Sequence, residues 1–229
     1  MTNLTKYCII IPAYNAETTL PQLINKINEI VQSIQIIVIN DGSYDSTGKI
    51  ANVLVVNHNR NQGKGEAIKT GFRTASDKGY TYAIFLDADL QHDPTKIPDF
   101  IKTQCETNAD LVVGKRDFNL KNMPFFRYLS NTWTSGLITI RTGRKISDSQ
   151  CGFRLVKLDS VNINDFVYTG FQFESEFVIK YLLNDKIVAE VEIPTIYASE
   201  KSSINHIPDT LKFIKLYFNS FLWKKRGKK

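Results

Sequence analysis

Short apolar runs alternate with segments of helical periodicity along the first half of the chain. The runs are rich in β-branched residues and are continuously apolar, which is typical of strands covered on both faces of a sheet. They occupy residues 8–11, 36–39, 53–56, 83–86 and 111–113.

The segments between these runs predict helices. Residues 18–31 place Leu20, Leu23, Ile24 and Ile27 on one helical face. Residues 66–75 and 94–107 are the next expected crossover helices. This alternation predicts an α/β fold with a Rossmann-like, open and mostly parallel sheet flanked by helices.

The rhythm changes after Gly114. Residues 124–140 mix aromatic, basic and apolar side chains, and could form a helix at the protein surface. We then expect a polar loop over 141–150, a strand over 153–156, a helix over 174–183 and a strand over 187–197. With 229 residues, the chain is long enough for one substantial core. We expect one domain over residues 1–205, followed by an amphipathic helix and a basic tail over 206–229.

Polar residues follow several of the predicted strands. In open α/β sheets, ligands bind beyond the carboxyl ends of the strands. Asp41 follows the second run, and Asp87 and Asp89 follow the fourth, with Gln91 two positions further on. Hard oxygen ligands at this spacing suit Mg²⁺ or Mn²⁺. The alternative interpretation of an isolated D-x-D is an aspartate-rich turn.

Charge and cysteine content add the cellular context. The formal net charge is +6, of which the C-terminal tail contributes five charges. The three cysteines are odd in number and far apart, which favours a reducing cytoplasm. We find no signal peptide and no apolar stretch of the roughly 20 residues needed to cross a bilayer. The five tail cations are Lys224, Lys225, Arg226, Lys228 and Lys229.

Six motifs occur in a fixed order along the chain, and together they resemble family 2 glycosyltransferases, closest to the dolichyl-phosphate mannose synthase and polyprenyl-phosphate glycosyltransferase branch. The resemblance spans about residues 7–197 and implies a GT-A fold. The motifs are Pro12-x-Tyr14-Asn15, Asn40-Asp41-Gly42-Ser43-x-Asp45, Asn61-x-Gly63-x-Gly65-x-Ala67, Asp87-Ala88-Asp89-x-Gln91, Gly114-Lys115-Arg116 and Asp148-x-x-x-Gly152-Phe153-Arg154.

The resemblance implies roles at the donor side of the site. The metal ligands would be Asp87, Asp89 and Gln91, with Asp89 nearest the diphosphate and a Mg²⁺ or Mn²⁺ cofactor. The glycines of the third motif would let the backbone approach the sugar nucleotide, although a tight turn before a helix is the plainer interpretation. The residues implied to bind the nucleotide sugar are Pro12, Ala13, Tyr14, Asp41, Gly63, Lys64, Asp87 and Ala88.

Further candidates lie in the last motifs. Arg116 and Arg154 offer cations that match phosphate oxygens, or are ordinary structural arginines. Asp148 would orient the acceptor, act as a general base, or be a turn residue. A sugar hydroxyl needs such a base, whereas a lipid phosphate is already anionic. Direct displacement inverts the anomeric centre in either case.

The acceptor side departs from the family pattern. Glu174 begins the helix expected at the acceptor, where a carboxylate also favours the helix dipole. The lipid-phosphate branch usually carries an Arg and a Gly-x-Ser-Lys run after Ile193-Pro194, whereas this chain reads Ala198-Ser199-Glu200-Lys201. Lys201 is the candidate replacement for the basic contact.

These features predict an inverting, metal-dependent hexosyltransferase that uses a UDP- or GDP-sugar. The expected acceptor is polyprenyl (dolichyl or undecaprenyl) phosphate, and a carbohydrate hydroxyl of a cell-surface polysaccharide is the alternative. A nucleic-acid-binding module is disfavoured, because the basic residues are concentrated in the tail. The helix near the C-terminus mixes aromatic side chains with lysines, which suits an anionic membrane surface or a helix docked on the domain. We therefore expect a cytoplasmic protein, peripheral on the cytoplasmic face of the membrane.

Overall fold

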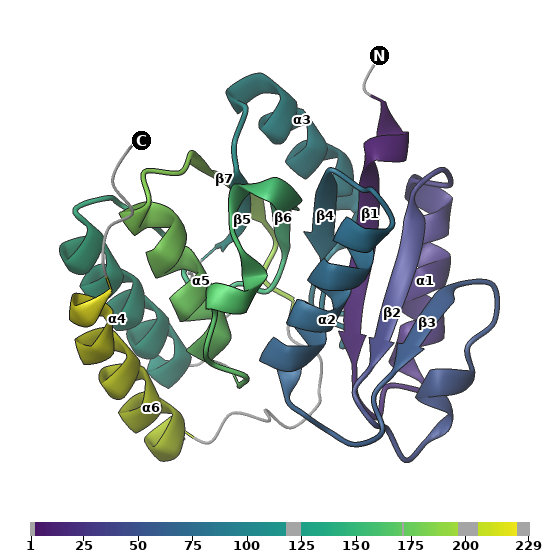
Figure 1. Ribbon diagram of the computed structural model, residues 1–229, viewed down its shortest axis with the longest axis horizontal. Helices are drawn as coiled ribbons and strands as arrows, with labels where there is room; N and C mark the ends of the chain where they lie inside the picture. The colour runs from purple at the N-terminus through teal and green to yellow at the C-terminus, as the bar shows by residue number, and fades with distance from the viewer. Residues whose placement is uncertain (1–2, 118–124, 171, 197–205, 224–229) are drawn as a thin grey trace.

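The computed structural model describes residues 3–117, 125–170, 172–196 and 206–223. Its centre is a seven-stranded sheet with the strand order β3-β2-β1-β4-β6-β5-β7 (Figure 1). The strands are β1 (Tyr7–Ala13), β2 (Gln35–Asn40), β3 (Leu54–Asn57), β4 (Tyr82–Phe85), β5 (Leu111–Arg116), β6 (Arg154–Lys157) and β7 (Val188–Ile193).

Six α-helices surround the sheet within the described residues. Figure 1 places α4, α5 and α6 together beside the β5 end of the sheet, away from α1 and β3. The helices are α1 (Thr19–Ile30), α2 (Lys64–Asp77), α3 (Ile97–Thr107), α4 (Phe125–Thr142), α5 (Gln172–Leu183) and α6 (His206–Asn219). The expected mostly parallel α/β sheet with flanking helices is confirmed.

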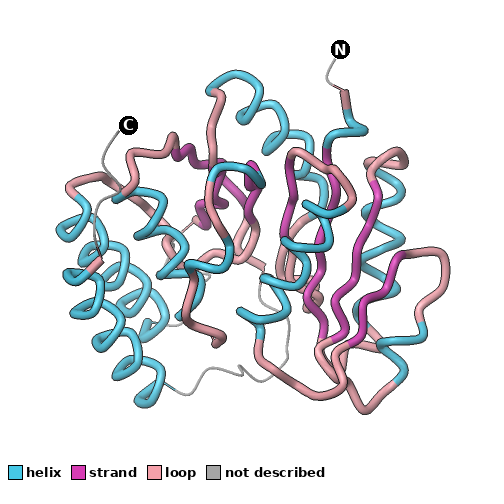
Figure 2. The backbone as a smooth tube through the Cα atoms, viewed as in Figure 1, coloured by secondary structure: helices cyan, strands magenta, loops and turns pink. Residues whose placement is uncertain are grey.

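The apolar runs form the strands because they are buried on both sides. Residues Ile9, Ile10 and Ile11 of β1 and Ile37 and Val38 of β2 are all inaccessible to solvent. Strands β1, β2, β3 and β4 pair in parallel. Their carboxyl ends therefore meet at one edge of the sheet, seen at the lower right of Figure 2.

Strand β6 is the exception to the parallel arrangement. It is antiparallel to both β4 and β5. Its first residue, Arg154, pairs with Phe85 at the end of β4 and with Val113 of β5. The antiparallel direction brings the residues just before β6 to the edge where the parallel strands end.

Several element boundaries differ from expectation by a few residues. Helix α2 begins at Lys64 rather than Glu66, because Gly63, with φ of 93°, turns the chain directly into the helix. Strand β7 ends at Ile193, short of the expected residue 197. The segment 124–140 is confirmed as a helix, α4.

Helix α6 packs against the domain on one side only. Phe213 and Leu216 are buried, and the Arg141 guanidinium of α4 donates to the carbonyl and hydroxyl of Ser220 at 2.6 and 3.0 Å. The outward side chains of Phe218 and Leu222 are 66% and 82% exposed. No helix in the described parts of the chain is long and apolar enough to cross a membrane.

Candidate active site at the carboxyl ends of the strands

Asp41 follows β2 and fastens the loop that leads to α2. Its Oδ1 accepts from the Gln62 backbone N–H at 2.9 Å, and its Oδ2 accepts from the Gly63 N–H at 2.9 Å. His58 Nδ1 lies 2.7 Å from Oδ1, and His58 Nε2 lies 2.9 Å from the Thr70 hydroxyl. Asp41 is 3% exposed, so both of its oxygens already hold the protein's own loop. Its predicted contact with the nucleobase remains a prediction.

The glycines at the start of α2 allow a close approach of another backbone segment. A Cβ added to Gly63 would lie 2.7 Å from the Thr169 carbonyl oxygen, and one added to Gly65 would lie 2.8 Å from the same residue. The Gly65 N–H also donates to that carbonyl at 2.6 Å. The glycines therefore have a structural reason in Thr169. Direct approach to a sugar nucleotide, as expected for Gly63, is not needed to explain them.

Three acidic side chains and one lysine converge beyond β4. Lys64 Nζ lies 2.7 Å from Asp87 Oδ1 and 2.7 Å from Glu174 Oε1. The Glu174 contact is an ion pair rather than a well-directed hydrogen bond, because Oε1 is buried and no donor is aligned with it in the described structure. Asp89 accepts from the Gln91 backbone N–H at 3.0 Å. Lys64 thus links the D-x-D turn to helix α5.

The pKa values in this cluster reflect one cation shared among several carboxylates. Burial alone lowers the pKa of Lys64, but Asp87 and Glu174 outweigh it and hold that pKa above its usual value. Burial alone raises the pKa of Asp87, but Lys64 and His92 outweigh it and the pKa falls. The pKa of Asp89 is raised by burial and by the negative charge of Asp87. A further positive charge near Asp89 would offset the repulsion from Asp87 and lower this pKa again.

Two residues outside the nominated set shape the D-x-D turn. Burial lowers the pKa of His92 to about 4, so its ring is neutral, and Nδ1 accepts from the Asp87 backbone N–H at 3.1 Å. A Cβ added to Gly152 would lie 2.5 Å from Asp87 Oδ2. The sequence motifs did not nominate His92, although its position next to D-A-D-L-Q was the available signal.

The residues present fit a divalent cation whose remaining ligands come from a bound molecule. Asp87 and Asp89 supply hard oxygens, and an added positive charge would reduce their mutual repulsion. Gln91 has its backbone in contact with Asp89, and lies on the same turn after Leu90, whose φ is 62°. Among the described residues no cluster of three or more His, Cys, Asp or Glu could complete a metal site. A diphosphate would be the natural source of further oxygen ligands.

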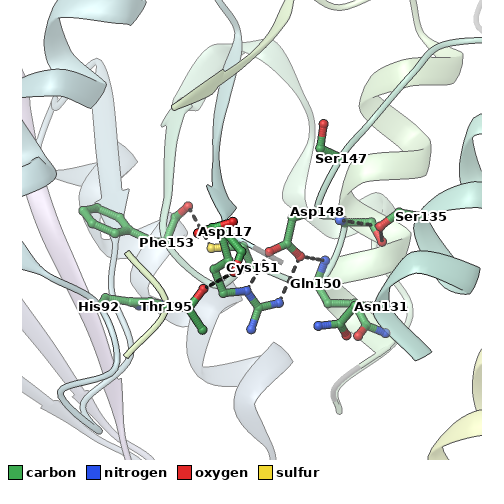
Figure 3. A network of polar contacts seen from close by, with 12 residues as sticks. His92, Asp117, Asn131, Ser135, Ser147, Asp148, Gln150, Cys151, Phe153 and Thr195 are labelled. Carbon is green, nitrogen blue, oxygen red and sulfur yellow. Dashed lines mark hydrogen bonds and ion pairs between the residues drawn. The ribbon is translucent and has the colours of Figure 1, made fainter. Parts of the chain in front are cut away.

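Asp148, labelled in Figure 3, forms an ion pair with Arg116 at the end of β5. Arg116 Nε donates to Asp148 Oδ2 at 2.6 Å, and Arg116 Nη2 donates to Oδ1 at 3.0 Å. The Gln150 backbone N–H donates to Oδ1 as well, at 3.2 Å. Asp148 has no solvent exposure. Its geometry suits orientation of Arg116, and leaves little opportunity to receive a proton from an acceptor.

Arg154 is buried, and its guanidinium is surrounded by backbone carbonyl groups. Its guanidinium donates to the carbonyl oxygens of Cys151, Ser149 and Glu174 at 2.7, 3.0 and 3.2 Å. The side chain is buried and lies over the ring of Phe177, with 5.7 Å between guanidinium carbon and ring centroid. Arg154 therefore fixes the segment before β6 and the start of α5 around the acidic cluster. Direct contact with a substrate phosphate, as its catalytic assignment requires, has no support in this geometry.

The other nominated residues lie around the same edge. Pro12 and Ala13 end β1, and Tyr14 is exposed, with its ring 6.4 Å from that of Tyr44. Ala88 is buried within the D-x-D turn. Lys201 lies outside the described residues, as does the basic tail.

The sequence of this chain is similar to known proteins. The model of the family described as "Glycosyl transferase family 2" matches residues 8–163. A UDP-N-acetylglucosamine–dolichyl-phosphate N-acetylglucosaminyltransferase from Methanococcus voltae is 30% identical over 82% of this chain and 85% of its own. An undecaprenyl-phosphate mannosyltransferase from Micrococcus luteus is 27% identical over 80% of this chain and 81% of its own.

The fold also has solved counterparts. Glucosyl-3-phosphoglycerate synthase from Mycobacterium tuberculosis, in a complex with Mn²⁺, UDP and glucosyl-3-phosphoglycerate, superposes with a TM-score of 0.70 at 18% identity. The match covers 94% of this chain and 78% of that protein. At this identity the likeness concerns the fold.

Proposed function

Because this chain belongs to glycosyl transferase family 2, we propose that it transfers a hexose from a UDP- or GDP-sugar to polyprenyl phosphate, with inversion at the anomeric carbon. The observation that carries the proposal is the cluster of Asp87, Asp89, Glu174 and Lys64 at the carboxyl ends of the parallel strands. A site that binds a diphosphate and stabilises it as a leaving group needs this mixture of charges.

The donor would lie along the ends of β1, β2 and β4. Tyr14 is exposed for stacking at the nucleoside end. Asp87 and Asp89, with Gln91 beside them, would hold Mg²⁺ or Mn²⁺ against the diphosphate. When bound, such an ion neutralises charge on the departing diphosphate. The Mn²⁺ and UDP bound to the structural neighbour from Mycobacterium tuberculosis agree with this assignment.

The acceptor is inferred from the lack of an available base among the described carboxylates of the site. Asp148 is closed by Arg116, Asp87 and Glu174 contact Lys64, and Asp89 is assigned to the divalent cation. A lipid phosphate needs no base, because its oxygen is already anionic. That oxygen would form a bond to the anomeric carbon while the bond from that carbon to the diphosphate oxygen breaks. The named activities of the Methanococcus and Micrococcus relatives support the same acceptor class.

We propose that the protein acts at the cytoplasmic surface of the membrane. Helices α4 and α6 lie side by side, with Trp133 and Phe213 ring centroids 6.1 Å apart (Figure 1). Large apolar side chains stay exposed on both helices and on the short helix η6 (Ser220–Leu222) that follows α6: Leu129, Trp133, Ile140, Leu211, Phe218 and Leu222. Amphipathic helices of this kind bind the headgroup layer. The tail lysines and arginine would add attraction to anionic lipids.

A transfer assay tests the acceptor. Purified protein with Mn²⁺ receives a panel of UDP- and GDP-hexoses and short-chain polyprenyl phosphate, and product is detected by mass spectrometry. We expect a sugar-phosphate-polyprenol product of inverted anomeric configuration. The matched control acceptor is the polyprenol without its phosphate. Transfer to the free alcohol, or only to glycans, would make a hydroxyl acceptor the correct assignment.

Flotation with vesicles tests the membrane assignment. Deletion of α6 would also remove the buried Phe213 and Leu216 and uncover the surface on which they pack, so we prefer the triple variant Leu211→Ser, Phe218→Ser, Leu222→Ser. We expect the unaltered protein to bind phosphatidylglycerol vesicles and the triple variant to lose this binding. Val167→Ser, at a 74% exposed position elsewhere, is the control and should bind normally. Equal flotation of all three proteins would show that the helices are packing elements.

A further inference from the structure

Lys64 occupies a position where the proposed function requires a different cation. Its ammonium lies between Asp87, a proposed metal ligand, and Glu174, which belongs to helix α5. We propose that Lys64 is a built-in counter-ion, which neutralises Asp87 until a nucleotide diphosphate and a divalent cation arrive together, and which then turns about Glu174 to contact the diphosphate. This inference rests on the proposed metal-dependent transfer.

Lys64 is the available neutralising partner in this part of the described structure. The Arg116 guanidinium is engaged by Asp148, and Arg154 donates to three backbone carbonyls. His92 accepts from the Asp87 backbone N–H through Nδ1, and its Nε2 lies 3.9 Å from Asp87 Oδ2, farther than the Lys64 ammonium at 2.7 Å. A divalent cation at Asp87 would therefore compete directly with the Lys64 ammonium for the same carboxylate. Metal binding without nucleotide should be weak for this reason.

The two partners of Lys64 differ in what they lose when it moves. The Asp87 side chain is 23% exposed, whereas the Glu174 side chain is 6% exposed. Glu174 Oε1 is buried with no aligned hydrogen-bond donor, so separation from the ammonium would leave a buried charge without compensation. Asp87 can exchange the ammonium for a metal ion. Glu174 is thus the fixed partner, and a positioning residue for Lys64.

Helix α5 provides a rigid base for this exchange. Nearly all of its side chains are buried, including Phe173, Phe177 and Tyr181, and the Glu174 carbonyl is held by Arg154. The Lys64 backbone is equally constrained, because Gly63 and Gly65 on either side pack against Thr169. The flexible part of the assembly is the lysine side chain itself. Movement of that side chain would make diphosphate and metal binding mutually dependent.

Mn²⁺ binding provides a test that does not require turnover. Electron paramagnetic resonance measures free Mn²⁺ in titrations of the full chain, with and without UDP or GDP. In the unaltered protein we expect the nucleotide to tighten Mn²⁺ binding. In Lys64→Met we expect Mn²⁺ alone to bind at least about fivefold tighter, and the enhancement by nucleotide to fall at least about fivefold, the scale of a modest coupling between sites.

Two further variants keep the result interpretable. Lys157→Met removes a lysine from an ion pair with Asp159, at the strand end opposite the site, and should match the unaltered protein. Glu174→Gln removes the fixed partner but keeps the ammonium at Asp87, so Mn²⁺ alone should bind no tighter while the enhancement by nucleotide falls. If Lys64→Met does not fold, the double variant Lys64→Met, Glu174→Gln removes the buried unpaired charge and should give the same tightening.

The outcomes separate this inference from the proposed function. If the unaltered protein binds Mn²⁺ with nucleotide, but the lysine variants show unchanged Mn²⁺ affinity and unchanged enhancement, Lys64 is not a counter-ion and the proposed function stands. If the unaltered protein binds no Mn²⁺ with either nucleotide, the metal-dependent function fails and the inference fails with it.

Discussion

The two acidic strand ends of this protein hold their carboxylates in different ways. Asp41, after β2, gives both oxygens to backbone N–H groups and to His58. Asp87, after β4, is neutralised by the ammonium of one long side chain. Backbone donors are fixed by the fold, whereas a lysine ammonium has rotamer freedom and can be exchanged. Similar motifs after β2 and β4, the two strands that flank β1, therefore provide one rigid corner and one responsive corner.

This difference separates residues that build the site from residues that react to a ligand. The Arg116–Asp148 pair belongs with Asp41, because two directed bonds and the complete burial of Asp148 fix its geometry. The D-x-D turn belongs to the responsive class, since Asp89 lies near a second carboxylate and carries a raised pKa. Substitutions in the first class should change stability. Substitutions in the second class should change turnover or metal affinity.

Asp89→Asn should produce the largest effect. The amide keeps the shape and can still accept from the Gln91 N–H, but removes the charge that would hold a divalent cation. Loss of several kcal/mol of charge stabilisation corresponds to at least about a thousandfold in turnover. Steady-state transfer at limiting Mn²⁺ measures it. The thermal midpoint should stay within a few degrees of the original.

The control for this substitution is Asp93→Asn. Asp93 caps the short helix η3 (Pro94–Lys96) by accepting from the Thr95 N–H at 3.0 Å, and asparagine caps helices equally well. Turnover of Asp93→Asn should be normal. Near-normal turnover of Asp89→Asn as well would remove Asp89 from the metal site and the D-x-D turn from the responsive class.

Asp148→Asn should have the next largest effect, on stability. It leaves Arg116 with an amide in place of its carboxylate, and loss of one partner of a buried ion pair costs about 3 kcal/mol. Urea unfolding followed by circular dichroism measures the free energy of unfolding. If Asp148 were a catalytic base instead, turnover would vanish while the unfolding free energy stayed unchanged. That combination of results would reverse the assignment.

Asp41→Ala should cost less, but in two measurable quantities. Loss of the acceptor for the Gln62 and Gly63 N–H groups should lower the free energy of unfolding by about 2 kcal/mol. If Asp41 also reads the nucleobase, the UDP or GDP dissociation constant should weaken by about 1 to 3 kcal/mol. Isothermal titration calorimetry distinguishes the two. An unchanged dissociation constant in a destabilised variant would give Asp41 a purely structural role.

Lys115→Met should have the smallest effect. Lys115 precedes Arg116 in the same motif, but its ammonium pairs with Glu192 at 3.0 Å on the surface, where Glu192 is 85% exposed. Exposed pairs contribute little to stability. The thermal midpoint and the nucleotide dissociation constant should match those of the unaltered protein. A lowered nucleotide affinity would extend the site to Lys115.

The fold was largely predictable because burial on both faces requires continuously apolar strands. Runs such as 8–11 and 36–39 carry that requirement in their composition. The direction of β6 was not predictable, since an apolar run has no polarity of its own. Pairing of Arg154 with Phe85 and Val113 appears only when the sheet is assembled.

The candidate site was predictable where its residues are close in sequence. Asp87 and Asp89 share one turn, and their position after a buried strand made them candidate metal ligands, an assignment that stays a prediction. The bridge from Lys64 to Glu174 joins residues far apart in the chain, and no local pattern encodes it. The glycines were expected to let the backbone approach the sugar nucleotide, which stays a prediction, and in the structure they pack against the Thr169 backbone. Similarly, Arg154 was recognised as important although its contacts are structural.

The central position of β6 has a consequence for synthesis on the ribosome. Strands β1 to β4 are complete by Phe85 and form one side of the sheet by pairing with one another, so they can assemble while the rest of the chain is being made. Strand β5 emerges next but has no place beside β4, because β6 lies between them. Strand β5 therefore cannot join the sheet, and α4 cannot take its final position, until β6 has left the exit tunnel as far as residue 157. During that interval the apolar strand and its helix are the part of the chain that most needs a chaperone.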